Sequence, residues 1–108
     1  MKHFHAHLYY NSDTFELAKR VISQATKLDY VEIGRMHEKP VGPHPMWSCQ
    51  LLFKTENLSK MIPWLMQNRE GLIVFVHPVS GNDLEDHTIH AMWLGEAVDL
   101  NIEMFKKS

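Results

Sequence analysis

Stretches of alternating hydrophobicity and stretches of helical periodicity follow one another along the chain. Period-two alternation and one continuous apolar run predict four strands, which cover residues 3–10, 30–35, 46–53 and 72–76. One-sided apolar stripes predict two helices, over about residues 13–28 and 55–69. Asp13 is suited to cap the first helix. Pro63 falls inside the second stripe, so that helix is expected either to begin near Met61 or to be kinked.

Proline and glycine mark the segments between these elements. Residues 38–45 contain three prolines and a glycine, which predicts a loop. Pro78 is expected to end the fourth strand, because proline cannot donate a ladder hydrogen bond. Beyond it, apolar patterns predict a short strand at 91–95 and a last amphipathic strand at 98–104.

The order strand, helix, strand, strand, helix, strand predicts a ferredoxin-like α+β sandwich. Its antiparallel sheet would carry two helices on one face and gain extra C-terminal strands. The whole chain, residues 1–108, is expected to form one domain. The first strand is then central, and Phe4, Ala6 and Leu8 face the helices. By the same alternation, the side chains on the open face are His3, His5, His7 and Tyr9.

Distant segments meet on this open face, because the first strand runs antiparallel to the third and the fourth. The expected neighbours are His44 and Trp47 beside Tyr9, and His77 beside His3 and His5. Such a face does not stay bare. We expect the final strands, a second copy of the chain in a homodimer, or both to cover part of it.

Composition and charge argue against several kinds of partner. The net charge of −2 gives no attraction to nucleic acid or to an anionic membrane. The longest apolar runs are too short to span a bilayer as a helix. Cys49 is the single cysteine and the N-terminus has no signal-peptide pattern, so the expected location is cytoplasmic. Motifs of nucleotide binding, serine hydrolysis and zinc ribbons are absent from the sequence.

Histidine is the residue type that stands out, with eight copies. His5 and His7 point the same way along one strand, which lets two neutral imidazoles converge on a metal ion. The alternative is a solvated strand face that is rich in histidine. His77 precedes a proline, which favours extended backbone. It is either a further ligand or a strand-end histidine bonded to a carbonyl.

Two further segments that contain histidine have two possible roles each. His44 lies between two prolines, which suits a positioned acid, base or ligand, or simply makes a rigid loop. The segment with Asp86, His87 and His90 offers either another ligand or a carboxylate that orients an imidazole.

Three further side chains are candidates for substrate contact. Trp47 and Trp93 either wall an aromatic substrate or fill the core. Arg35 either pairs with a substrate carboxylate or is solvated. Cys49 alternates with buried positions, which favours packing.

Four segments together resemble the DOPA 4,5-dioxygenase family, and the likeness covers nearly the whole chain. They are His-Ala-His-Leu-Tyr-Tyr at 5–10, Val-Gly-Pro-His-Pro at 41–45, Leu-Ile-Val-Phe-Val-His-Pro at 72–78, and Asp-His-Thr-Ile-His-Ala-Met-Trp-Leu-Gly at 86–95. The resemblance implies a ferredoxin-like, commonly dimeric protein that opens a catechol ring, as in DOPA or a caffeate-like compound. It does so beside the hydroxyls, with O₂ at non-heme iron(II). The motif histidines that carry over are His5, His7, His44, His77, His87 and His90.

Within this resemblance, each residue receives an expected role. We expect the metal ligands to be His5, His7 and His77, and the residues of proton transfer to be His44 and His90. The expected substrate-binding residues are Tyr9, Trp47, Arg35 and His87. Non-heme iron sites usually include a carboxylate, for which Asp86 and Glu32 are the candidates. An all-histidine site suits zinc or nickel as well.

Two other classes of function stay open. One is a different metal-dependent enzyme, such as a hydrolase or isomerase that uses zinc-bound water. The other is a non-catalytic dimer that binds a metal or a small aromatic molecule.

Overall fold

The computed structural model describes residues 2–106. The strands in this range form one antiparallel sheet in the order β2-β3-β1-β4-β5. The strands are β1 (His3–Tyr10), β2 (Val31–Met36), β3 (Trp47–Lys54), β4 (Val74–Val79) and β5 (Met92–Leu94). β1 lies in the middle and pairs with both β3 and β4. The predicted ferredoxin-like α+β architecture is therefore confirmed, with β5 as the added C-terminal strand.

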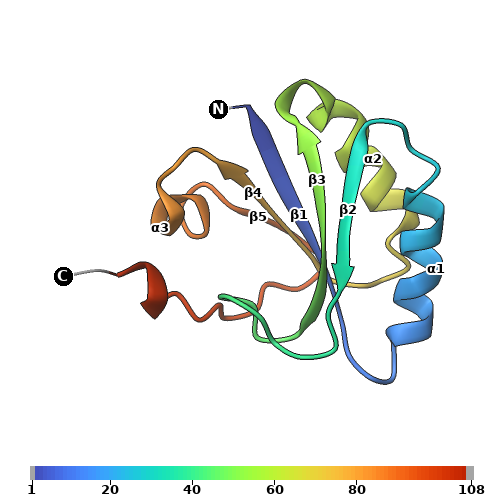
Figure 1. The fold of residues 1–108 in the computed structure, drawn as a ribbon, viewed down its shortest axis with the longest axis horizontal. Helices are drawn as coiled ribbons and strands as arrows, with labels where there is room; N and C mark the ends of the chain where they lie inside the picture. Colours follow the sequence, from blue (N-terminus) through green and yellow to red (C-terminus); the bar gives the residue numbers. More distant parts are fainter. Residues whose placement is uncertain (1, 107–108) are drawn as a thin grey trace.

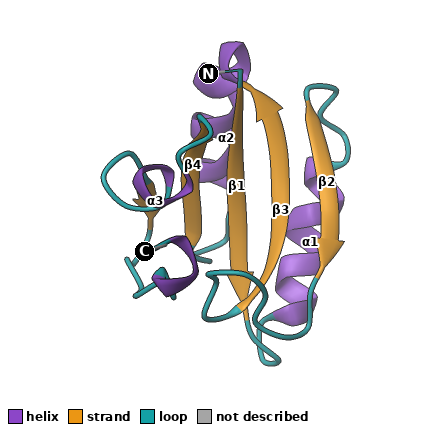
Figure 2. Cartoon of the chain, turned by 60° about the vertical axis from the view of Figure 1, so that its left-hand side comes forward, coloured by secondary structure: helices purple, strands orange, loops and turns teal. Residues whose placement is uncertain are grey.

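The helices divide between the two faces of the sheet. They are α1 (Phe15–Ala25), α2 (Leu58–Asn68) and α3 (Asp83–Asp86), with short 3-10 segments η1 (Thr55–Asn57) and η2 (Glu103–Phe105). α1 and α2 cover one face, whereas α3 and the C-terminal segment lie on the opposite side (Figure 1, Figure 2). Within residues 2–106, none of the helices has the length and apolar character that crossing a bilayer demands.

The helix-covered face holds the hydrophobic core. Ala6, Leu8 and Tyr10 of β1 point to this face and are at most 1% exposed, as the alternation predicts. They pack with buried residues of the helices and of the neighbouring strands, among them Ala18, Val21, Ala25, Cys49, Leu51, Phe53, Met61, Leu65, Val74 and Val76. Full burial of a large apolar side chain stabilises a fold by about 1.5–3 kcal/mol. The core therefore fixes β1, and with it the direction of the alternate residues on the other face.

The two helix starts agree with the predictions only in part. The side chain of Asn11, not that of Asp13, satisfies the backbone before α1, since its Oδ1 accepts hydrogen bonds from the N–H groups of Asp13 and Thr14. The second helical stretch begins near residue 55, as predicted, because η1 leads directly into α2 at Leu58. Of the two alternatives for Pro63, the start near Met61 is wrong, since α2 continues through this proline. Pro63 lies in the second turn and removes a single backbone donor, which the packing of this helix tolerates.

The end of β4 is also later than predicted. Pro78 is part of the strand and pairs opposite Phe4 of β1. β5 pairs with β4 only over Val74–Val76, so Pro78 lies where β4 is an edge of the described sheet. A proline is tolerated at such an edge because its missing N–H costs no ladder bond.

The predicted last strand at 98–104 is wrong. This segment is irregular, except where η2 begins at Glu103, although Val98 and Ile102 are half-buried. A backbone hydrogen bond ties this segment to the rest of the described chain: the N–H of Asn101 donates to the carbonyl of Pro43. The alternation therefore reflects one-sided packing against the body of the protein, without a strand partner.

Candidate functional site

Three histidines from two adjacent strands converge on the face opposite the core. His5 and His7 are two residues apart on β1, so both point away from the helices. His77 of β4 pairs directly opposite His5, as predicted. One potential ligand atom from each of the three residues lies within 4.8 Å of the others. We call these three residues the histidine cluster.

The contacts in the histidine cluster are those of neutral imidazoles. Nε2 of His7 lies 3.0 Å from Nε2 of His77. Nδ1 of His77 donates a hydrogen bond of 2.8 Å to the carbonyl of Pro78, so its Nε2 is the bare nitrogen when the ring is neutral. A hydrogen bond to a carbonyl was one of the two interpretations of His77, and this bond is present. It directs the other ring nitrogen, Nε2, into the cluster.

Burial keeps these rings uncharged. Burial is the main reason that the pKa of His77 is lowered to about 4; the hydrogen bond to the carbonyl of Pro78 opposes this shift, and the nearby His87 adds to it. Burial and then the neighbouring histidines hold the pKa of His7 well below its usual range. The pKa of His5 is also lowered, chiefly by burial. Neutral imidazoles with available lone pairs are what a metal ion requires, so the residues present fit a metal.

His44 joins the histidine cluster from the loop between β2 and β3. Its ring lies 4.1 Å from that of His7, and its Nδ1 is 2.7 Å from the hydroxyl of Tyr9. Both partners are buried, Tyr9 to 1% exposure. Burial, followed by the nearby histidines, lowers the pKa of His44 to about 4. The predicted approach of His44 to Tyr9 is confirmed, but Tyr9 contacts this histidine instead of facing an open pocket.

A cavity of about 200 Å³ opens beside His7 and His44. Its walls come from β1, from β3 and from the loop between β2 and β3, and are His7, His37, Val41, Gly42, Pro43, His44, Ser48 and Gln50. Among the described residues, none that lines this cavity is Asp, Glu, Lys or Arg. The cavity therefore suits a small, polar but uncharged group.

His87 closes the other side of the histidine cluster. Its ring centroid lies 4.1 Å from that of His77, with the two rings tilted, and stacks 4.5 Å from Phe105, so it lies between the cluster and the C-terminal segment. Its Nδ1 donates to the carbonyl of Asp83. Asp86 is 1% exposed, and its two oxygens accept hydrogen bonds from the N–H and the hydroxyl of Ser80. This carboxylate therefore anchors α3 and is not among the potential ligands.

Three predicted site residues do not reach the histidine cluster. Trp47 packs against Tyr10 and Phe15 on the helix-covered face, because it shares its alternation phase with the buried half of β3. Its predicted approach to the site is wrong. Arg35 is exposed on the outer strand β2, and His90 is exposed after α3.

Phe75 is the residue that pattern analysis missed. It pairs opposite His7, and its ring lies 4.5–6.3 Å from those of His7, His44, His77, His87 and Trp93. The continuous apolar run of β4 concealed its face. Its spacing of two from His77 is the signal that could have placed it.

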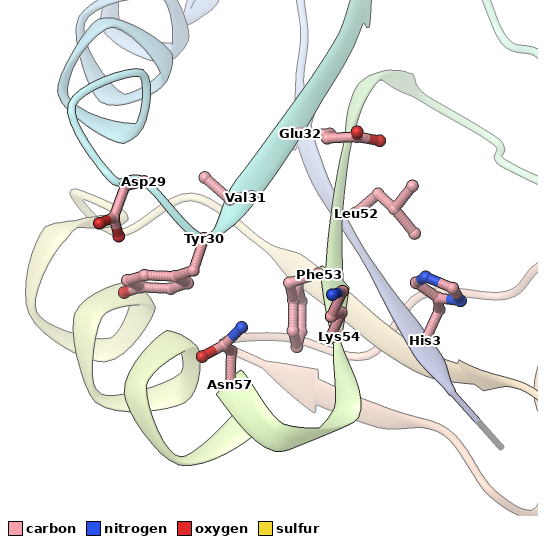
Figure 3. A pocket seen from close by; sticks show the side chains of 9 residues that line it. All are labelled: His3, Asp29, Tyr30, Val31, Glu32, Leu52, Phe53, Lys54 and Asn57. Atoms are coloured by element: carbon pink, nitrogen blue, oxygen red, sulfur yellow. The ribbon is translucent and has the colours of Figure 1, made fainter.

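A larger cavity of about 320 Å³ lies away from the histidine cluster (Figure 3). Its walls are His3, Asp29, Tyr30, Val31, Glu32, Leu52, Phe53, Lys54 and Asn57. Figure 3 shows Glu32 on β2 and His3 on β1 as parts of this wall. Glu32 is exposed, so the second candidate carboxylate is also outside the potential ligand group.

Comparison with known proteins gives consistent findings. The Dopa 4,5-dioxygenase family model matches residues 4–104. The chain is 33% identical to an uncharacterized 21.2 kDa protein of Botryotinia fuckeliana, covering 96% of this chain and 63% of that protein. It is 29% identical to DOPA 4,5-dioxygenase of Amanita muscaria, covering 94% of this chain and 49% of that enzyme. The chain thus spans about half to two thirds of these curated relatives.

The fold is similar to that of a solved bacterial structure. A crystal structure of a candidate dioxygenase from Nostoc punctiforme superposes with a TM-score of 0.92 and is 42% identical in sequence. The match covers 95% of this chain and 90% of that one.

Proposed function

This chain belongs to the Dopa 4,5-dioxygenase family, and on that premise we propose that it is an extradiol dioxygenase. It would use iron(II) and O₂ to open the ring of a catechol such as DOPA or a caffeate-like compound. The observation that carries this proposal is the convergence of three neutral imidazoles beside a small uncharged cavity.

His5, His7 and His77 are the proposed metal ligands. Iron(II), when bound, supplies open coordination positions for the catechol oxygens and O₂ and passes electrons between them. Metal binding at neutral pH does not require these imidazoles to lose a proton, since their pKa values lie below the usual range of histidine. The hydrogen bond from His77 to Pro78 holds its ring with Nε2 toward the other two residues.

The cavity beside His7 supports a single aromatic ring as the bound part of the substrate. Its volume of about 200 Å³ is below the roughly 300–1,000 Å³ of drug-sized pockets. Ser48 and Gln50 offer hydrogen-bonding groups for the ring hydroxyls. A charged side chain such as the amino acid group of DOPA would extend out of the cavity, because no charged residue among the described ones lines it.

His44 is the residue that we propose acts on the bound substrate. It lines the same cavity as His7, and its neutral ring is able to exchange a proton or a hydrogen bond with a substrate oxygen. His90 is exposed after α3, which favours His44 of the two predicted residues.

The test is an oxygen-uptake assay on protein loaded with iron(II) under anaerobic conditions. DOPA, caffeate and unsubstituted catechol are added with air, and both O₂ consumption and the yellow ring-opened product are recorded. We expect both signals, and we expect them to disappear in His7→Ala, which loses a ligand. Iron-loaded protein that consumes no O₂ with any of these catechols would contradict the proposal.

A second candidate is a hydrolase or isomerase that uses zinc-bound water. It is favoured by one observation, the absence of a carboxylate from the ligand group found within residues 2–106. Three histidines with an open position make a known type of catalytic zinc site. Activity that persists under argon with zinc-loaded protein would support this candidate over the dioxygenase.

A further inference from the structure

The Tyr9 hydroxyl and the His44 imidazole form a buried pair next to the histidine cluster. The oxygen lies 2.7 Å from Nδ1 of His44, and both side chains are at most 7% exposed. The ring of Tyr9 is held at an edge-on contact with Trp93, 5.9 Å away. The backbone of the His44 loop is fixed as well, through hydrogen bonds from His44 to Val41 and from Asn101 to Pro43. Each partner thus has contacts besides their mutual hydrogen bond that hold it in place.

The direction of this hydrogen bond follows from the acceptors available. A buried hydroxyl hydrogen needs an acceptor, and Nδ1 of His44 is the one that the Tyr9 oxygen reaches within residues 2–106. If Nδ1 carried the proton and donated it to the oxygen, the hydroxyl hydrogen would be left without an acceptor. The favoured arrangement has Tyr9 as donor, a bare Nδ1 and the ring proton of His44 on Nε2.

We infer that Tyr9 is a positioning residue, which holds His44 in the tautomer that presents Nε2–H as a hydrogen-bond donor to an oxygen of the bound substrate. This inference deepens the proposed function and rests on it for the role of His44. A pre-oriented donor stabilises negative charge that develops on an oxygen without having to reorganise during the reaction. The donor also suits the cavity, which His44 lines without a charged neighbour among its described walls.

Proton–nitrogen correlation spectra of the imidazole rings test the tautomer directly. Metal-free and zinc-loaded protein are used, and the His44 signals are assigned by their absence from His44→Gln. We expect a bare Nδ1 and a protonated Nε2 in the unmodified protein. In Tyr9→Phe we expect a mixture of both tautomers, because the donor to Nδ1 is gone. A proton on Nδ1 in the unmodified protein, or an unchanged tautomer in Tyr9→Phe, would overturn the inference.

Tyr10→Phe is the matched control. Tyr10 is the next residue of β1 and is equally buried, but its hydroxyl donates to the backbone carbonyls of His37 and Ser48 and not to His44. This variant loses a buried hydroxyl that makes no hydrogen bond to His44, so the His44 tautomer is expected to stay as it is, and any fall in kcat is expected to be smaller than in Tyr9→Phe. In Tyr9→Phe, kcat is expected to fall about 10-fold to 100-fold, while KM changes little.

The outcomes separate the two proposals. Equal losses of kcat in Tyr9→Phe and Tyr10→Phe would indicate general loosening of β1 and would contradict a positioning role. If the unmodified protein opens no catechol, the proposed function fails, while the spectra still decide whether Tyr9 sets the tautomer of His44.

Discussion

Acid should destabilise the metal-free protein well before its carboxylates are protonated. His44 and His77 have a pKa of about 4 in the folded state, because burial disfavours their charged forms. In the unfolded chain, the pKa of histidine is about 6.5. Between these values the unfolded state binds more protons, so the free energy of unfolding falls as the pH falls from about 6.5 to 4. Above pH 7 these histidines are neutral in both states, so they do not make the free energy of unfolding depend on pH.

The expected size of this effect is large for a small domain. With this pKa difference, each of the two histidines lowers the free energy of unfolding, relative to its value at neutral pH, by about 2 kcal/mol at pH 5 and by about 3 kcal/mol at pH 4. His7 shifts in the same direction. A domain of this length has a total stability of about 5–15 kcal/mol. The metal-free protein is therefore expected to lose much of its stability by pH 4.

Urea unfolding in the presence of a chelator measures this directly. Fluorescence and circular dichroism are followed at a series of pH values from 7.5 to 4. His77→Gln should show a flatter dependence on pH, because a titrating group is removed. His3→Gln, which changes an exposed histidine at the start of the neighbouring strand β1, should follow the unmodified protein. Equal free energies of unfolding at pH 7 and pH 5 would refute the reasoning.

Three further predictions concern the metal, the thiol and the core. His7→Ala should remain folded by circular dichroism but lose bound metal in equilibrium dialysis, and retained metal would remove His7 from the site. Burial raises the pKa of Cys49 to about 11, so iodoacetamide should modify it only in denaturant; rapid modification of native protein would contradict its place in the core. Leu8→Ala should cost about 2–5 kcal/mol in urea unfolding, because Leu8 is fully buried; a cost below 1 kcal/mol would be inconsistent with the packing of β1.

Much of the fold could be predicted because β1 carries a clear two-residue period. Its faces divide apolar residues from histidines, and that division alone places β1 over a core with a chemical face opposite. The predicted last strand failed because alternation reports which side of a segment is buried, not whether a strand lies beside it. The backbone of Asn101 finds a loop carbonyl, that of Pro43, instead of a strand.

The histidine cluster was partly predictable for the same reason. Antiparallel pairing brings His77 to His5 once the strand order is known. Trp47 was misplaced although its phase with Cys49 indicated the core face. The approach of His44 to Tyr9 was predicted from the same pairing, but their hydrogen bond was not, because it depends on the path of an irregular loop that no periodicity describes.

The most direct test of the proposed chemistry is the fate of the two atoms of O₂. Iron(II)-loaded protein is given caffeate under an atmosphere of heavy-isotope oxygen, and the ring-opened product is analysed by mass spectrometry before its new groups exchange with water. Extradiol cleavage predicts that both labelled atoms enter the same product molecule. A ring-opened product without label, whose new oxygen comes from water, or an unopened ring with O₂ unconsumed, would contradict the assignment of this histidine cluster to a dioxygenase.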